Sequence, residues 1–184
     1  MPGAQRPRLA RSAHAHTRPT PFEHNEAMML ERYAAIYRRD LLEQVIPFWL
    51  NHSLDREHGG YFTCLDRDGT VYDPRKYVWL QGRAVWMFAR LYNALEPRPE
   101  WLAAAAHGVE FLRRNARDEQ GRVYFSLSRD GRPAFYQRKP YAGVFYQMGL
   151  YEYARATGDA ACRAEAIEVF ERIRERIADP TLLG

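Results

Sequence analysis

The chain lacks the sequence features of disulfide-rich, metal-binding and membrane-spanning proteins. It has two cysteines in 184 residues, and Cys64 and Cys162 lack metal-ligand spacing. So few cysteines fit a reducing compartment better than a disulfide scaffold, and we expect a cytoplasmic protein. No apolar run reaches membrane length, and no secretory hydrophobic segment is present, so the sequence predicts no membrane association.

Acidic residues are scarce at the start of the chain. Residues 1–24 contain four arginines and a single acid, Glu23. Their prolines and histidines predict a disordered basic tail over residues 1–25. An organellar transit peptide is the alternative, although prolines oppose its amphipathic helix. The formal net charge is +4, most of it in this tail, so nothing indicates a nucleic-acid partner.

The rest of the chain has enough apolar residues for one domain, residues 26–184. Hydrophobic residues make up 46% of the sequence, and apolar positions at helical spacing predict a helix over 28–50. We expect Pro47 to end or kink that helix. Beyond it, the stretches YFTCL and TVYD flank the turn sequence DRDG and predict a hairpin. Helices are then predicted over 77–95 and 101–116.

This pattern occurs twice. EHGGYFTCLDRDG matches EQGRVYFSLSRDG at a separation of 62 residues, and two further helices are predicted over 141–156 and 161–178. In each unit the first helix is apolar on most faces, whereas the second has one polar face that is expected to contact solvent. Alternation of inner and outer helices predicts an all-α curved array or toroid.

Arg83 is the unexpected residue of the first inner helix, YVWLQGRAVWMFARLY. The second repeat has Val144 or Phe145 at the matching position, so the scaffold does not require arginine there. A buried guanidinium needs partners. One hypothesis is that Arg83 pairs with an acid such as Asp73. The other is that it faces the central cavity and binds a polar ligand.

Two sequence stretches carry a family resemblance. WLQGR and HGGYFT resemble the N-acylglucosamine 2-epimerase family, also called renin-binding protein, and the similarity extends over about residues 28–178. The resemblance implies the N-terminal part of an (α/α)6 barrel, left incomplete by this chain. It also implies interconversion of N-acetylglucosamine and N-acetylmannosamine by proton transfer at C2. Arg83 and Tyr141 then correspond to substrate-pocket residues, and nearby Trp79 could stack on the sugar or belong to the core.

The chemistry of C2 epimerisation sets what a site must contain. It requires two acid/base groups, for which histidine is best suited, and a donor for the enediolate oxygen, for which arginine is suited. No metal or cofactor is required. The resemblance places the catalytic histidines beyond Gly184, so we expect this chain to be inactive alone. It also implies ATP as an activator, a homodimer, and renin as a partner of animal-type members.

The local histidines are not expected to replace the missing ones. We expect His52 and His58 on a surface loop and His107 solvated on an outer helix. Two other functions stay open. A non-catalytic α-array could bind proteins through exposed apolar surface. A glycoside hydrolase would need opposed carboxylates, whereas Asp55 and Glu57 share one loop.

Overall fold

The computed structural model describes residues 21–179 and 181, and the chain divides into two compact units, residues 1–43 and 44–184. The first unit contains helix α1, Pro21–Asp40. The expected tail boundary is therefore wrong for residues 21–25, which are helical. Proline suits the first turn of a helix because its missing N–H has no partner there in any case. The rest of the predicted tail lies outside the described residues.

The predicted helix over 28–50 changes type before Pro47. A π-helical turn, Leu41–Val45, follows α1, and α2 spans Ile46–His52 with Pro47 in its first turn. A proline ring clashes with the carbonyl four residues earlier and has no N–H to donate. The wider turn lies where that clash would occur, so Pro47 is accommodated and the helix continues to His52.

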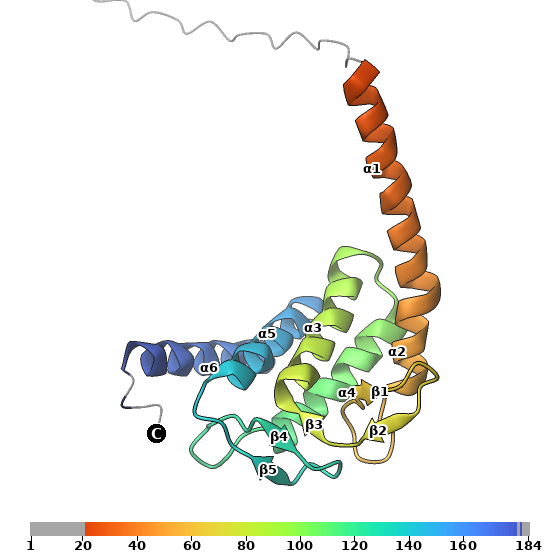
Figure 1. Cartoon of the computed structure of the whole chain (residues 1–184). Helices are drawn as coiled ribbons and strands as arrows, with labels where there is room; N and C mark the ends of the chain where they lie inside the picture. The colour runs from red at the N-terminus through yellow and green to blue at the C-terminus, as the bar shows by residue number, and fades with distance from the viewer. Residues whose placement is uncertain (1–20, 180, 182–184) are drawn as a thin grey trace, which may run out of the picture. The chain divides into compact units, whose positions relative to one another are not determined.

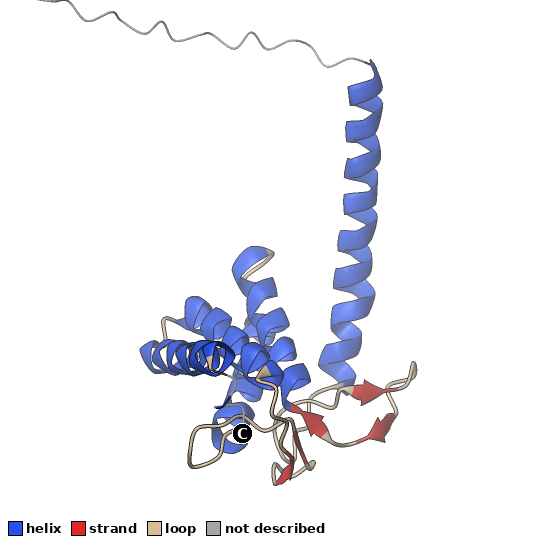
Figure 2. Ribbon diagram, turned by 60° about the vertical axis from the view of Figure 1, so that its left-hand side comes forward, coloured by secondary structure: helices blue, strands red, loops and turns tan. Residues whose placement is uncertain are grey.

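Two small sheets accompany the long helices of the second unit. β1, Cys64–Leu65, pairs antiparallel with β2, Val71–Asp73, as the predicted hairpin. β3, Lys76–Tyr77, pairs instead with the hairpin of the second repeat, in the order β3-β4-β5. Figure 2 shows both sheets at one end of the helices. The bounds of the other two strands are Ser126–Leu127 and Pro133–Phe135.

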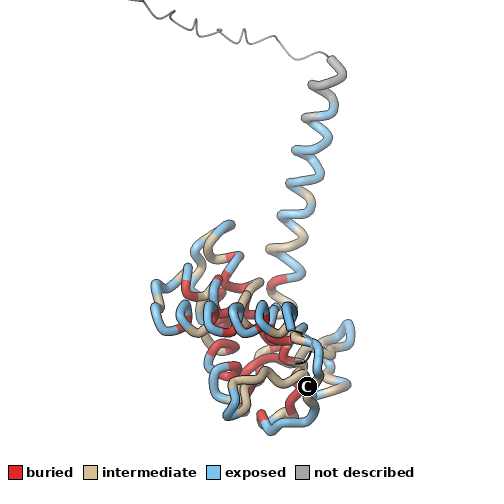
Figure 3. Tube along the Cα trace, turned by 90° about the vertical axis from the view of Figure 1, so that its left-hand side faces the viewer, coloured by how far each residue is buried: buried red, intermediate tan, exposed pale blue. Residues whose placement is uncertain are grey.

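Four helices form the body of the second unit, and all four predictions are confirmed to within a few residues. α3 packs against α4 and α5, and α5 packs against α6 (Figure 1). Buried residues gather where these helices face one another (Figure 3). The helices span Val78–Ala94, Pro99–Asn115, Tyr141–Thr157 and Ala160–Ala178.

A close backbone crossing joins the two inner helices, α3 and α5. A Cβ atom at Gly82 would lie 2.4 Å from the carbonyl oxygen of Phe145, and one at Gly149 would lie 2.6 Å from the carbonyl oxygen of Gly82. Only glycine permits this approach without moving one helix. The two glycines therefore bring α5 against the base of α3.

A buried charge cluster links the two repeats. Asp55 accepts hydrogen bonds from Lys76 Nζ at 2.9 Å and from Arg129 Nε at 3.1 Å. Lys76 is fully buried, also donates to the Gly59 carbonyl, and lies 4.4 Å from the centre of the Phe111 ring. Burial alone would raise the pKa of Asp55, but the bonds from Arg129 and Lys76 lower it to about 2. Asp55 is therefore charged, and it holds the turn of the second hairpin against the loop that precedes the first.

Candidate functional site

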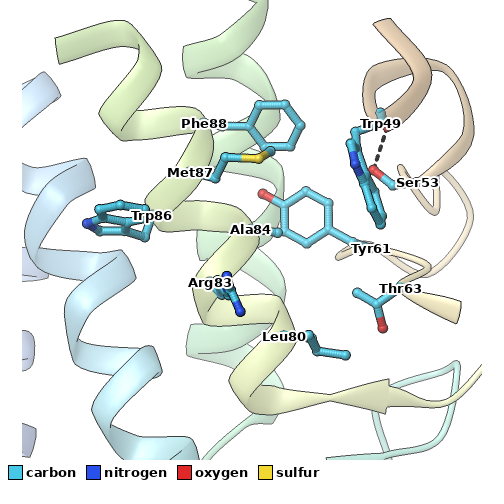
Figure 4. A pocket seen from close by; sticks show the side chains of 10 residues that line it. All are labelled: Trp49, Ser53, Tyr61, Thr63, Leu80, Arg83, Ala84, Trp86, Met87 and Phe88. Atoms are coloured by element: carbon cyan, nitrogen blue, oxygen red, sulfur yellow. Dashed lines mark hydrogen bonds between the residues drawn. The ribbon is translucent and has the colours of Figure 1, made fainter. Parts of the chain in front are cut away.

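A cavity of about 360 Å³ opens between α2, the segment before β1, and one face of α3 (Figure 4). Its walls are mostly apolar, with a few polar groups among them, which is the usual composition of a small-molecule site. The lining residues are Trp49, Ser53, Tyr61, Thr63, Leu80, Arg83, Ala84, Trp86, Met87 and Phe88.

Arg83 is the only charged residue among those ten. It is exposed, so the expectation of a buried guanidinium is wrong. The pairing with Asp73 is also wrong, because Asp73 binds Arg75 at 2.9 Å and accepts a hydrogen bond from Tyr77. Arg83 makes no hydrogen bond or ion pair with any described residue. Its donors are therefore free to bind an oxygen-rich ligand.

The residues before Arg83 explain how it is held there. Gln81 is fully buried and binds the backbone of Tyr61 twice. The Tyr61 N–H donates to Gln81 Oε1 at 2.8 Å, and Gln81 Nε2 donates to the Tyr61 carbonyl at 2.7 Å. On another side of α3, the missing side chain of Gly82 allows the backbone of α5 to approach closely. The WLQGR stretch thus locks the first turns of α3 on two sides and leaves Arg83 facing the cavity.

Tyr61 forms a wall of the cavity and has no acid/base role there. The centre of its ring lies 5.9 Å from the centre of the Phe88 ring, and its hydroxyl donates to the Ala104 carbonyl at 2.6 Å. Burial raises the pKa of Tyr61 far above its ordinary value. The phenol therefore stays protonated at any working pH.

The two predicted aromatic site residues meet each other beside this cavity. The centres of the Trp79 and Tyr141 rings lie 5.7 Å apart, and both rings also contact Phe145. Trp79 precedes Arg83 by one helical turn on α3, but neither it nor Tyr141 lines the cavity with Arg83. Tyr141 is 48% exposed, so part of its side chain remains accessible to solvent.

Sequence reasoning missed the two tryptophans that do line the cavity. Trp49 belongs to α2, and Trp86 lies one turn after Arg83 on α3. The spacing of Arg83 and Trp86 could have indicated a shared face. No local pattern could have indicated Trp49, because only the tertiary fold brings α2 to α3.

Within the part of the chain that the structure describes, no histidine or carboxylate lines this cavity. His107 was expected to be solvated, but it is half-buried. Its Nε2 atom lies 3.0 Å from the Gly60 carbonyl oxygen. His52 is exposed, as expected, and His58 lies 3.5 Å from a Glu57 carboxylate oxygen. Arg129 binds both Asp55 and Glu57, so these acids are not an opposed pair across the cavity.

The described residues offer no metal cluster, disulfide or membrane-spanning helix. Within the described part of the chain, no group of three or more histidine, cysteine or acidic side chains could hold a metal ion. Both cysteines are free. None of the helices within residues 21–179 has the length and hydropathy needed to cross a membrane.

Comparisons with known proteins identify the family of this chain. Residues 60–183 match the family model for N-acylglucosamine 2-epimerase. The chain is 50% identical over 148 residues to N-acylglucosamine 2-epimerase of Bos taurus, covering 78% of this chain and 35% of the bovine protein. It is 34% identical to cellobiose 2-epimerase of Ruminococcus albus, covering 77% of this chain and 36% of that protein.

A solved structure extends the likeness to the fold. A sugar epimerase from a ruminal bacterium superposes with a TM-score of 0.71 at 32% identity, over 77% of this chain and 36% of the other. Such epimerases are (α/α)6 barrels, so the expected partial toroid is confirmed. The chain spans about a third of the length of the curated relatives it matches. On the family match, the shared helical repeats and the WLQGR stretch that presents Arg83, this chain belongs to the N-acylglucosamine 2-epimerase family.

Proposed function

We propose that this chain supplies the arginine-bearing part of the substrate site of a sugar 2-epimerase, and that the substrate is an N-acylated hexosamine. The observation that carries the proposal is Arg83, a guanidinium that no described residue pairs with, at an apolar cavity in a chain of this family. An arginine without a protein partner retains its full capacity to bind oxygen atoms of a ligand.

The reaction explains why such a donor is useful. In the ring-opened sugar, removal of the C2 proton beside the aldehyde at C1 leaves an enolate with negative charge on the C1 oxygen. A positioned guanidinium stabilises that charge. A proton returned to the opposite face of C2 completes the epimerisation. The groups that remove and return the proton are, in this proposal, supplied by the part of the barrel that the relatives have and this chain does not span.

Two observations support an N-acyl substrate over a disaccharide. Similarity to N-acylglucosamine 2-epimerases, at 50% identity, exceeds that to cellobiose 2-epimerases, at 34%. Next to Arg83 the cavity presents Trp49, Leu80 and Met87. An apolar wall suits the methyl of an acetyl group better than the hydroxyls of a second hexose. Activation by ATP and binding of renin, which the family resemblance implies, stay predictions.

Titration of the 184-residue chain with N-acetylmannosamine tests the proposal. We expect the indole N–H signals of Trp49 and Trp86 to shift in ¹⁵N-labelled protein, because both rings line the cavity. The Arg83→Met variant should bind at least about tenfold more weakly, since a charge-assisted hydrogen bond contributes about 1.5–3 kcal/mol. Arg90→Met is the matched control, an exposed arginine on the same helix that does not line the cavity.

Two results would count against it. Equal binding by the Arg83→Met and Arg90→Met variants would remove Arg83 from the site. Incorporation of deuterium at C2 when the isolated chain is incubated with the sugar in D₂O would show that the acid/base groups lie within this chain.

A further inference from the structure

The hydroxyl group of Thr63 is buried at the wall of the Arg83 cavity. Thr63 lines this cavity from the segment before β1 (Figure 4). Among the described residues, its Oγ1 atom is the one buried side-chain polar atom that makes no hydrogen bond. A buried hydroxyl without a partner destabilises a fold, and native structures contain few of them. Its position at a candidate ligand site therefore requires an explanation.

The internal repeat shows that the scaffold needs no hydroxyl at this position. At the separation of 62 residues that relates the two hairpins, the counterpart of Thr63 is Phe125. The Phe125 ring packs against those of Tyr77 and Phe135, with ring centres 5.9 Å apart in each pair. Thr63 and Arg83 thus share two properties. No described residue binds either side chain, and the second repeat has an apolar residue in place of each.

The other two hydroxyl groups of the cavity wall are already engaged. Ser53 Oγ donates to the Trp49 carbonyl at 2.6 Å, and the Tyr61 hydroxyl donates to the Ala104 carbonyl at 2.6 Å. A hydroxyl has one proton to donate, so neither group can give it to a ligand without losing its present bond. Of the three lining hydroxyls, Thr63 is the one whose proton no described residue accepts.

The backbone beside Thr63 is fixed relative to Arg83. Gln81, two residues before Arg83 on α3, binds both the N–H and the carbonyl of Tyr61. The Phe62 N–H donates to the backbone carbonyl that follows α2, at 2.6 Å. With the backbone held, rotation about the Cα–Cβ bond of Thr63 is enough to bring its hydroxyl to a position now taken by its methyl group or hydrogen. A ligand in the cavity therefore meets Arg83 on α3 and Thr63 on the segment before β1 (Figure 4).

We propose that Thr63 determines substrate specificity, because its hydroxyl donates a hydrogen bond to the carbonyl oxygen of the N-acyl group. The inference rests on the proposed function and assigns a contact to the part of the substrate that plain hexoses lack. Burying an amide carbonyl in an apolar cavity without a donor costs free energy. Thr63 supplies that donor, and Arg83 is left to bind the C1 oxygen, where negative charge develops.

Two substitutions at Thr63 test the inference in the 184-residue chain. Thr63→Val keeps the shape and removes the hydroxyl, whereas Thr63→Ser keeps the hydroxyl and removes the methyl group. Binding is followed through the indole signals of Trp49 and Trp86. For N-acetylmannosamine, Thr63→Val should bind about five- to tenfold more weakly than the parent, and Thr63→Ser within about twofold of it. For mannose, which has no acyl group, Thr63→Val should bind as the parent does, whereas Arg83→Met should weaken binding of both sugars.

Urea unfolding of the ligand-free variants separates a ligand contact from a structural one. Because the Thr63 hydroxyl has no partner in the described part of the chain, Thr63→Val should unfold at a urea concentration equal to or higher than that of the parent. Ser53→Ala is the matched control on the same cavity wall. It removes a hydroxyl that binds the Trp49 carbonyl, so it should unfold at a lower urea concentration.

Three outcomes overturn the inference. These are unchanged binding of N-acetylmannosamine by Thr63→Val, an equal loss of mannose binding in that variant, and unfolding of Thr63→Val at a lower urea concentration than the parent. Arg83→Met keeps the two proposals apart. Weaker binding by Arg83→Met with full binding by Thr63→Val overturns this inference alone, and the reverse overturns the role of Arg83 alone. A parent chain that binds neither sugar overturns both.

Discussion

The two repeats of this chain share a scaffold and differ at the residues that form the cavity. Both have a short hairpin, an inner helix and an outer helix, in the same order and at nearly constant separation. Where the first has Gln81 and Arg83, the second has Ala142 and Val144. The shared glycines and apolar faces therefore build the fold, whereas the positions that differ lock the first hairpin and line the cavity.

The largest expected effect tests the charge cluster that joins the repeats. Asp55→Ala leaves Lys76 buried without its carboxylate, and breaking a buried pair this way costs about 3–5 kcal/mol in the free energy of unfolding. Asp73→Ala, which removes a pair with the exposed Arg75, should cost at most about 1 kcal/mol. Urea unfolding measures both values. Similar losses in the two variants would mean that the cluster does not join the repeats.

Acid should weaken the same junction. The pKa of Asp55 is about 2 in the folded chain, below its ordinary value of 3.8. Because this pKa is lower in the folded chain than in the unfolded one, the charged carboxylate stabilises the fold at any pH above about 4. That stabilisation is lost as the pH falls from about 4 through 2. The loss amounts to about 2 kcal/mol. Unfolding measured over this range should show a smaller decline in Asp55→Ala than in the parent chain; equal declines would assign the acid sensitivity to other groups.

Paired glycine substitutions sharpen the comparison between the inner helices. Gly82→Ala places a methyl 2.4 Å from a backbone oxygen of α5 and should cost about 1–3 kcal/mol. Gly143→Ala, at the matching position of the second repeat, meets the flexible end of Ile173 at 3.1 Å. Its effect should be below about 1 kcal/mol, because alanine also favours the helix. Thermal unfolding compares them, and a reversed order would show that Gly82 is not the close crossing point.

The smallest expected effect concerns Arg83. Arg83→Val installs the residue of the second repeat at an exposed position that pairs with no described residue, so the free energy of unfolding should change by no more than about 0.5 kcal/mol. Binding of N-acetylmannosamine should nevertheless be lost. A loss of several kcal/mol in urea unfolding would instead make Arg83 a structural residue.

Much of the scaffold could be predicted because its signals are local. The helices over residues 78–94 and 141–157 follow from apolar periodicity, and the first hairpin follows from DRDG between alternating stretches. The pairing of β3 with β4 was not predicted, since it joins residues about 50 positions apart and no local pattern encodes it. The environment of His107 was missed for the same reason.

The sequence by itself determined the repeat, the inner and outer helices, the family, and Arg83 as the residue that the scaffold does not require. The tertiary structure alone decided that Arg83 is exposed and has no partner among residues 21–179, that Trp49 and Trp86 share its cavity, and that Trp79 and Tyr141 contact each other. The physical reason is that periodicity assigns a residue to a helix face. Whether that face is buried, paired or open depends on which distant segments pack against it.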